Sequence, residues 1–374
     1  MTIKPYREKW DGTMTDRERF NRQLHYKSVD RSFNREFGYW DENFKKWSLF
    51  KENGITNNQE ANKFFNFDKI GGIGGNVWMH PTFEHKVIDE TENKKVIRNP
   101  EGLIAEVPKD GHDTIPHFVD STIKTPEDWK KVKKERFDRD DPARKVDIDQ
   151  LKENHPEDRD YPLGVSCGSM IGKIRDMLTF EGLAFAIHDY PEMVEDMVET
   201  CCLLVEDFLD QVLPHFDFDF ASGWEDICFK SGPIVSVDFF KNVVAPRYKR
   251  IGNKLHKADI DIWYTDCDGD IRPILPYMLE AGINCMFPFE VNSSGHPGKL
   301  MDKYGKDLRI MGGVDKMALG KGKEAIKDYL ESLEPYVMDR GGFIPHVDHR
   351  CPPDVDEEDY LYYLDLKKEL FGSL

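Results

Sequence analysis

Histidine and acidic side chains are concentrated in residues 341–354 of the 374-residue chain, which read Gly-Gly-Phe-Ile-Pro-His-Val-Asp-His-Arg-Cys-Pro-Pro-Asp. The first half of this segment has the pattern of a buried strand, and the second half is a polar loop that ends at two prolines. Polar groups at the carboxyl end of a strand are what an α/β barrel places in its active site. His346 and His349 are therefore candidates for proton transfer or metal binding.

A pair of aspartates follows a second predicted strand, in the sequence Tyr-Thr-Asp-Cys-Asp-Gly-Asp of residues 264–270. Side chains alternate along a strand, so Asp266 and Asp268 point to the same side. Two carboxylates so close together are unfavourable unless a cation or a shared proton relieves their repulsion. The sequence does not decide whether this pair binds a metal ion or transfers a proton. The structural alternative, an acidic turn that caps the next helix, explains Asp270 better than Asp266.

A third acidic element, Gly-Trp-Glu-Asp, occupies residues 223–226 after another predicted strand. Glu225 or Asp226 could complete a metal shell or donate a proton. A helix cap at the start of the following segment is an equally weighted alternative.

From residue 161 onward, short apolar segments alternate with amphipathic helical segments. The clearest helix covers residues 192–213, where apolar side chains recur on one face with a helical period. This alternation predicts an α/β fold of the (β/α)8 barrel type, with an open doubly wound sheet as the alternative. We expect strands at residues 162–166, 216–221, 260–265, 283–288, 308–311 and 342–344, and further helices at residues 243–256 and from residue 356.

The chain before residue 161 has a less regular pattern. Residues 1–60 are polar and rich in aromatic side chains at loosely helical spacing, which predicts one or two amphipathic helices over the outside or mouth of the barrel. Residues 70–90 are predicted to contain strands, with the clearest pattern over residues 74–84. The glycine-rich residues 71–75 lack the flanking elements of a dinucleotide-binding loop and are interpreted as a turn. Residues 124–160 are dense in charge and predict surface helices.

At 374 residues the chain can build one large α/β domain or two smaller ones. A content of 39% hydrophobic and 12% aromatic residues supports a substantial core, and no low-complexity linker marks a boundary. We therefore expect a single barrel domain over residues 1–374. Within it, residues 1–160 form an N-terminal helical and strand elaboration that contributes to the barrel mouth.

The charge and the cysteines limit the classes of partner and the compartment. A net charge of −18 without a basic stripe argues against binding to nucleic acid. No apolar run is long enough to span a bilayer, and the amino terminus does not resemble a signal peptide. Seven scattered cysteines are typical of reduced thiols in the cytoplasm.

Residues 341–354 resemble the closing motif of the uroporphyrinogen decarboxylase-like superfamily, in which a Gly-Gly-aromatic-Ile strand leads to a Pro-Pro-Asp turn. The superfamily contains decarboxylases and cobamide-dependent methyltransferases, and the resemblance implies a barrel of the same type. In the cobamide:thiol methyltransferases of this fold, a His-x-Cys motif and a cysteine of the closing loop bind zinc. Strand-to-strand alignment places Asp266, Asp268 and His349 at these positions. The resemblance therefore implies a metal site, zinc by analogy, with oxygen and nitrogen ligands instead of thiolates.

The decarboxylase branch is disfavoured. Its members carry an arginine-rich Met-Arg-Gln-Ala-Gly-Arg motif that holds the carboxylates of a tetrapyrrole, and this chain lacks that motif. The Asp-Gly-Asp of residues 268–270 and the Asp-His of residues 348–349 resemble instead an acetogenic and clostridial branch of the methyltransferases. Those enzymes are first methyltransferases of O-demethylase systems, which move a methyl group from a methoxylated aromatic compound to the cobalt of a separate corrinoid protein.

This resemblance implies a role for each candidate residue. His349, Asp268, Glu225 and His346 are the expected catalytic residues, because cleavage of an aryl ether requires protonation or Lewis-acid binding of the leaving oxygen. An aromatic donor needs apolar walls, which Trp78, Trp224 and Phe287 are expected to supply, together with Phe83 and Phe289.

The corrinoid is expected on a partner protein that docks transiently, because the Asp-x-His-x-x-Gly pattern of cobalamin modules is absent from the chain. One alternative is a methylcobamide:thiol methyltransferase, or one with another acceptor, of the same fold. A second is a non-catalytic partner of a corrinoid protein. The sequence leaves open whether the chain forms a homodimer.

Overall fold

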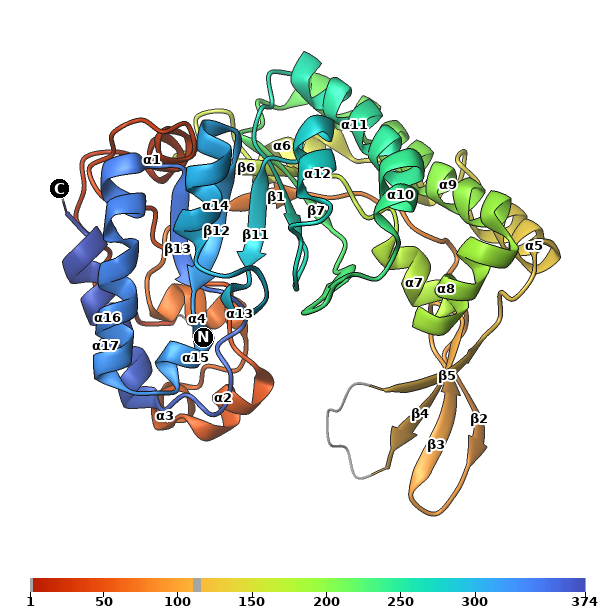
Figure 1. The fold of residues 1–374 in the computed structure, drawn as a ribbon, viewed down its shortest axis with the longest axis horizontal. Helices are drawn as coiled ribbons and strands as arrows, with labels where there is room; N and C mark the ends of the chain where they lie inside the picture. Colours follow the sequence, from red (N-terminus) through yellow and green to blue (C-terminus); the bar gives the residue numbers. More distant parts are fainter. Residues whose placement is uncertain (1–2, 110–115, 374) are drawn as a thin grey trace.

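A parallel sheet forms the centre of the protein in the computed structural model, which describes residues 3–109 and 116–373. Its seven strands are hydrogen-bonded in the order β1, β6, β7, β10, β11, β12, β13, and every neighbouring pair is parallel. Because the strands are parallel, their carboxyl ends meet at one end of the sheet, which is the lower end of β11 and β13 in Figure 1. The strands are β1 (Gly71–Ile73), β6 (Leu163–Ser166), β7 (Phe220–Trp224), β10 (Trp263–Asp266), β11 (Cys285–Phe289), β12 (Arg309–Val314) and β13 (Phe343–Val347).

An extended segment, residues 31–40, closes the sheet between its two edge strands. The Asp68 backbone N–H, just before β1, donates to the Asn34 carbonyl at 2.8 Å. The Cys351 N–H, just after β13, donates to the Gly38 carbonyl at 2.8 Å, and Tyr39 forms a parallel bridge with Cys351. The segment therefore takes the eighth position of a (β/α)8 barrel, as the sequence predicts.

Helices surround the barrel, and their apolar faces pack on it. The long α9 (Pro191–Val212) has a continuous buried face and confirms the clearest helix of the sequence pattern. None of the described helices combines the length and the low polarity needed to cross a lipid bilayer. The other helices of the second half are α7 (Gly172–Leu178), α8 (Phe180–Asp189), α10 (Val237–Phe239), α11 (Ala245–Lys257), α12 (Leu275–Ala281), α13 (Val291–Ser294), α14 (Pro297–Tyr304), α15 (Lys316–Leu319), α16 (Lys323–Glu334) and α17 (Glu357–Phe371).

The amino-terminal region contributes helices to the barrel. The Gln23 amide of α1 donates to the Phe343 carbonyl at the start of β13, at 2.6 Å, so α1 covers the amino-terminal end of the barrel. Four short helices occupy this region where the sequence predicts one or two. They are α1 (Asp16–Leu24), α2 (Asp41–Lys46), α3 (Ser48–Asn53) and α4 (Asn58–Phe64).

An antiparallel sheet extends beyond the barrel and lies below α7 and α8 in Figure 1. Its strands are β2 (Lys86–Glu90), β3 (Lys94–Arg98), β4 (Leu103–Pro108) and β5 (His117–Ser121), and α5 (Pro126–Arg136) and α6 (Ile148–Asn154) follow. These two helices confirm the predicted surface helices of residues 124–160. A small hairpin, β8 (Cys228–Phe229) with β9 (Gly232–Pro233), lies in the loop after β7.

The prediction of strands within residues 70–90 is confirmed by β1 and β2, but the structure places no strand over residues 74–84, where the strand pattern was clearest. The interpretation of residues 71–75 as a turn is wrong, because residues 71–73 are the first barrel strand. The glycines permit close packing instead of chain reversal: a Cβ at Gly71 would lie 2.6 Å from the Tyr161 ring, and one at Gly75 would lie 2.2 Å from the Phe208 ring.

Candidate active site

Two cavities lie at the carboxyl end of the barrel strands, each with a volume of about 590 Å³. They adjoin, since the Phe37 ring of the first is 5.7 Å from the His349 ring of the second. The inner cavity is lined by Arg35, Phe37, Val77, Trp78, Ser166, Gly168, Ser169, Lys173, Ser222, Gly223, Trp224, Tyr264, Asp266 and Phe287. The outer cavity is lined by Trp40, Arg175, Asp226, Cys228, Phe229, Lys230, Asp268, Gly269, Glu290, Asn292, Ser293, Lys316, His349, Arg350 and Pro352.

Asp268 and His349, predicted from two separate motifs, meet in the outer cavity. Their side chains form an ion pair with His349 Nε2 at 3.2 Å from Asp268 Oδ2. The Trp40 ring stacks on the imidazole with centroids 5.6 Å apart. Burial lowers the pKa of His349, but the hydrogen bond and charge of Asp268 outweigh that effect and raise the pKa above its ordinary value. The pair therefore favours an imidazolium that can donate a proton.

Asp266 lies on the wall of the inner cavity at the end of β10. Burial raises its pKa to about 7, and the nearby charges of Asp268 and Asp226 act in the same direction. A carboxyl group with this pKa carries a proton for much of the time near neutral pH. Asp266 is thus a second group that can donate a proton, and it lines the cavity that adjoins that of His349.

A metal ion held by Asp266, Asp268 and His349 stays a prediction. Within residues 3–109 and 116–373, no three His, Cys, Asp or Glu side chains are gathered closely enough to hold a metal ion as they stand. Asp268 Oδ2 pairs with His349, whereas Asp268 Oδ1 is buried without a hydrogen-bond partner among the described residues. No step below passes through a metal.

Glu225 lies beneath the site and supports the start of α7. Its carboxylate accepts backbone N–H groups of Met170, Ile171 and Gly172 at 2.5, 2.9 and 2.8 Å, and the Tyr248 hydroxyl also donates to it. Burial raises the pKa of Glu225 to about 7 despite these donors. Glu225 lines neither cavity, so its contacts are those of a positioning residue and differ from the proton donor predicted from the sequence.

His346 also differs from its predicted role. It is fully buried inside the barrel, between the rings of Phe37 and Phe287, and lines neither cavity. Burial lowers its pKa well below the ordinary value, and the charge of Arg35 adds to this effect. The alternation along β13 turns His346 inward, where its Nδ1 contacts the Val347 carbonyl oxygen at 2.8 Å and its Nε2 is buried without a described partner, whereas His349 lies beyond the strand end.

The predicted aromatic walls are largely present. Trp78, Trp224 and Phe287 all line the inner cavity. The other two predicted rings do not: Phe83 lies under the Arg136 guanidinium, 4.1 Å from it, and Phe289 is buried in the core.

Arg35, Tyr264 and Lys173 are among the residues of the inner cavity that were not predicted. The Lys173 ammonium lies over the rings of Trp78 and Trp224, at 5.8 and 5.3 Å from their centroids. Phe33, Arg35 and Phe37 are every second residue and so lie on one side of an extended segment, which could have placed Arg35 on the barrel side. The charged residues around them obscured this strand pattern.

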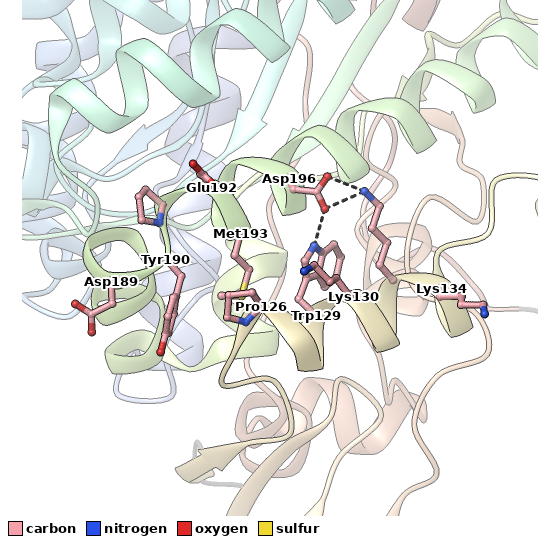
Figure 2. Close-up of a pocket in the computed structure, with 11 residues that line it drawn as sticks. Pro126, Trp129, Lys130, Lys134, Asp189, Tyr190, Glu192, Met193 and Asp196 are labelled. Atoms are coloured by element: carbon pink, nitrogen blue, oxygen red, sulfur yellow. Dashed lines mark hydrogen bonds and ion pairs between the residues drawn. The ribbon is translucent and has the colours of Figure 1, made fainter.

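A larger cavity, about 880 Å³, lies outside the barrel between α5 and the start of α9. Asp196 of α9 accepts hydrogen bonds there from Trp129, which is labelled in Figure 2, and from Lys133 of α5, at 2.7 Å each. These contacts attach α5 to α9. This cavity contains none of the predicted site residues.

The fold and the polar cavities at the strand ends define a (β/α)8 barrel protein with its candidate site at the usual end. Residues 103–370 match the family model of uroporphyrinogen decarboxylase (URO-D), and the chain belongs to that family. Among solved structures, it is similar to a methyltransferase from Methanosarcina mazei, with a TM-score of 0.52, 12% sequence identity and coverage of 96% of this chain and 99% of that one. No curated protein matches the sequence.

Proposed function

We propose that this protein is a methyltransferase that moves a methyl group from a methoxylated aromatic compound to the Co(I) corrinoid of a partner protein. The observation that carries the proposal is the Asp268–His349 ion pair at the junction of the outer cavity with an inner cavity lined by aromatic side chains. The structural neighbour that covers nearly the whole chain is also named a methyltransferase, which supports the same class.

The proposed reaction requires an acid at the ether oxygen. The cobalt of the partner would supply the nucleophile that accepts the methyl group. As the C–O bond breaks, its electron pair stays on the phenolic oxygen, which is a poor leaving group unless it is protonated. His349 is held as an imidazolium by Asp268 and donates that proton, while Trp78 and Trp224 hold the ring. Asp268 stabilises the charge of the imidazolium before transfer.

Transfer to a thiol remains the alternative within the same fold. It would require activation of a thiol, which a zinc ion with thiolate ligands favours. Three cysteines lie near the site, Cys228 on the wall of the outer cavity and Cys267 and Cys351 behind it, and all three are buried. The pKa values of Cys267 and Cys351 lie well above the ordinary value, for Cys267 chiefly because of its hydrogen bond with Cys228 and for Cys351 because of burial, so neither is poised to act as a thiolate. A non-catalytic role would leave the Asp268–His349 pair without a purpose.

The function is tested by single-turnover methylation of a Co(I) corrinoid protein by wild type and His349→Ala. With a methoxyarene, the variant should be slower by about 10²–10⁴-fold, while the Kd of the donor changes little, because the proton is needed in the transition state. When the donor is a quaternary methylammonium ion, the leaving group is a neutral amine and needs no acid. If the enzyme accepts such a donor, His349→Ala should transfer its methyl group at nearly the wild-type rate.

His188→Ala is the matched control, since His188 is exposed on α8 and pairs only with its neighbour Asp189. It should leave both rates unchanged. Equal rates for wild type and His349→Ala on the ether would remove His349 from the mechanism. The absence of methyl transfer from every donor of a panel would reject the proposed function.

A further inference from the structure

Two cysteine thiols meet at the wall of the outer cavity. Cys228 belongs to β8 in the loop after β7, and Cys267 directly follows β10. The two thiols form a hydrogen bond with each other. Both side chains are buried, but Cys228 lines the outer cavity and Cys267 lies behind it. A small molecule in the cavity therefore reaches the sulfur of Cys228 first.

The backbone holds the two cysteines beside each other. Backbone hydrogen bonds of 2.8 and 2.9 Å join residues 225–229, after β7, to residues 266–270, after β10. Between these bonds the two loops are in direct contact, because a Cβ at Gly269 would lie 2.4 Å from the Cys228 carbonyl oxygen. The position of Cys267 relative to Cys228 is thus set by the packing of the two loops.

The other cysteines are placed differently. Cys201 and Cys202 are consecutive residues of α9, and consecutive side chains on a helix do not face each other. Cys167, Cys285 and Cys351 are buried at separate positions in the chain. As the described residues form the two cavities, none of these five thiols lines either one. Cys228 and Cys267 combine mutual contact with access from a cavity.

We propose that Cys228 and Cys267 are a redox-sensitive thiol pair, which a small disulfide entering the outer cavity oxidises to a disulfide bond that displaces the adjacent carboxylates. The Cys228 sulfur, having released its proton, attacks one sulfur of the small disulfide, whose S–S bond breaks and releases one thiol. The Cys267 sulfur then attacks the Cys228 sulfur of the mixed disulfide and displaces the second thiol. Two protein S–H groups are oxidised, one small disulfide is reduced to two thiols, and these take up the two protons.

The bond would alter the candidate active site because Cys267 stands between Asp266 and Asp268. The two sulfur atoms must move from hydrogen-bond contact to about 2.0 Å, and the backbone that carries both aspartates must follow. A displacement of about 1 Å at catalytic groups can cost about 10²-fold in rate. This consequence for methyl transfer rests on the proposed function, whereas the oxidation of the thiols does not.

Thiol counting on the full-length protein tests the pair without any turnover. The reduced protein, freed of reductant under anaerobic conditions, is incubated with bis(2-hydroxyethyl) disulfide, and the remaining thiols are alkylated. Intact mass and peptide mapping should show that two of the seven thiols are lost and that a bond joins Cys228 to Cys267. Dithiothreitol should reverse it. Seven remaining thiols, or a bond between other cysteines, would overturn the proposal.

Serine variants assign the two roles. Cys267→Ser should stop at the mixed disulfide and carry one mercaptoethanol group on Cys228, whereas Cys228→Ser should keep Cys267 reduced. Cys202→Ser is the matched control, because the Cys202 thiol is buried, donates to the Arg247 carbonyl at 3.7 Å and lies outside both cavities. It should oxidise as wild type does. An adduct on Cys267 in Cys228→Ser would contradict the proposal, and should a variant fail to fold, the wild-type peptide map decides.

Methyl transfer separates this inference from the proposed function. With Co(I) corrinoid freed of its reductant, oxidised wild type should be slower than reduced wild type by about 10- to 100-fold. The same treatment should leave the rate of Cys228→Ser unchanged. Equal rates for oxidised and reduced wild type would overturn the proposed effect on the site. If the Cys228–Cys267 bond forms but the reduced enzyme transfers a methyl group from no donor, the thiol pair stands and the proposed function fails.

Discussion

At the scale of single residues, Asp266 combines burial with two neighbouring carboxylates, and its pKa is raised to about 7. In the unfolded chain this carboxyl ionises near its ordinary value of 3.8. Between these two pH values the folded state binds the extra proton, so Asp266 stabilises the fold at low pH, and this stabilisation is lost as the pH rises through about 7.

Asp266→Asn should remove that dependence. Relative to wild type, the variant should gain roughly 1–3 kcal/mol in the free energy of unfolding between pH 4 and pH 8, a figure reduced because the carboxyl faces a solvent-accessible cavity. Urea denaturation at several pH values measures it. Asp270→Asn is the control: the Arg272 hydrogen bond lowers the pKa of Asp270, so its contribution is lost only at acidic pH. A pH-independent difference for Asp266→Asn would contradict the assignment.

The residues of the site were predictable to the extent that their signal is local. Asp268 and His349 stand at the ends of strands that the sequence pattern identifies, and the barrel topology then brings them to one place. The role of Glu225 was not predictable, because its partners are backbone groups of residues 170–172, which the sequence does not show to be adjacent. Arg35 was missed because its place on the cavity wall depends on the extended segment of residues 31–40, whose sequence carries no strand pattern.

At the scale of elements, the start of α7 depends on Glu225. Backbone N–H groups at a helix start have no partner in the helix, and here the carboxylate accepts three of them in the protein interior. A Cβ at Gly172 would lie 2.0 Å from the Glu225 carbonyl, so helix and loop are in direct contact. This contact holds Lys173 and Arg175 beside Trp224.

Glu225→Gln should weaken this connection, because an amide has one acceptor oxygen where the carboxylate has two, and its NH₂ group faces donors. We expect a loss of about 2–4 kcal/mol in the free energy of unfolding and faster amide exchange at residues 170–172. Glu181→Gln, on the exposed start of α8, should change stability by less than about 0.5 kcal/mol. Wild-type exchange rates in Glu225→Gln would show that the carboxylate is dispensable.

Elements of the barrel follow from the sequence better than those outside it. Buried parallel strands are apolar runs between helical patterns, and this signal identified β6, β10, β11, β12 and β13 to within a few residues. The segment that closes the barrel, residues 31–40, is charged and pairs through few hydrogen bonds, so no strand pattern marks it. The strands β2, β3 and β5 are short and largely exposed or only partly buried, and only β4 shows alternating burial, at Leu103 and Ala105, so the buried-strand signal is weak in this sheet.

At the scale of the whole molecule, the barrel mouth has a surface suited to a protein partner. Four large apolar side chains are exposed around the outer cavity, by 39–54%, and the Phe180 and Phe229 rings lie 5.5 Å apart. They are Trp40, Phe180, Phe229 and Met317. Lys230 and Arg350 line the same cavity in a chain of net charge −18. Apolar groups ringed by charge are typical of transient docking sites.

If the corrinoid protein docks on this surface, Phe229→Glu should raise its KM by about 10-fold or more, since an exposed aromatic anchor is replaced by a charge. The rate with free cobalamin, which needs no protein contact, should stay close to that of wild type. Phe185→Glu is the control, because Phe185 is 68% exposed on α8 and lines neither the inner nor the outer cavity. If Phe185→Glu raised the KM for the corrinoid protein more than Phe229→Glu does, the docking surface would lie elsewhere than at the mouth. An equal loss of rate with free cobalamin in Phe229→Glu would also contradict docking at this surface.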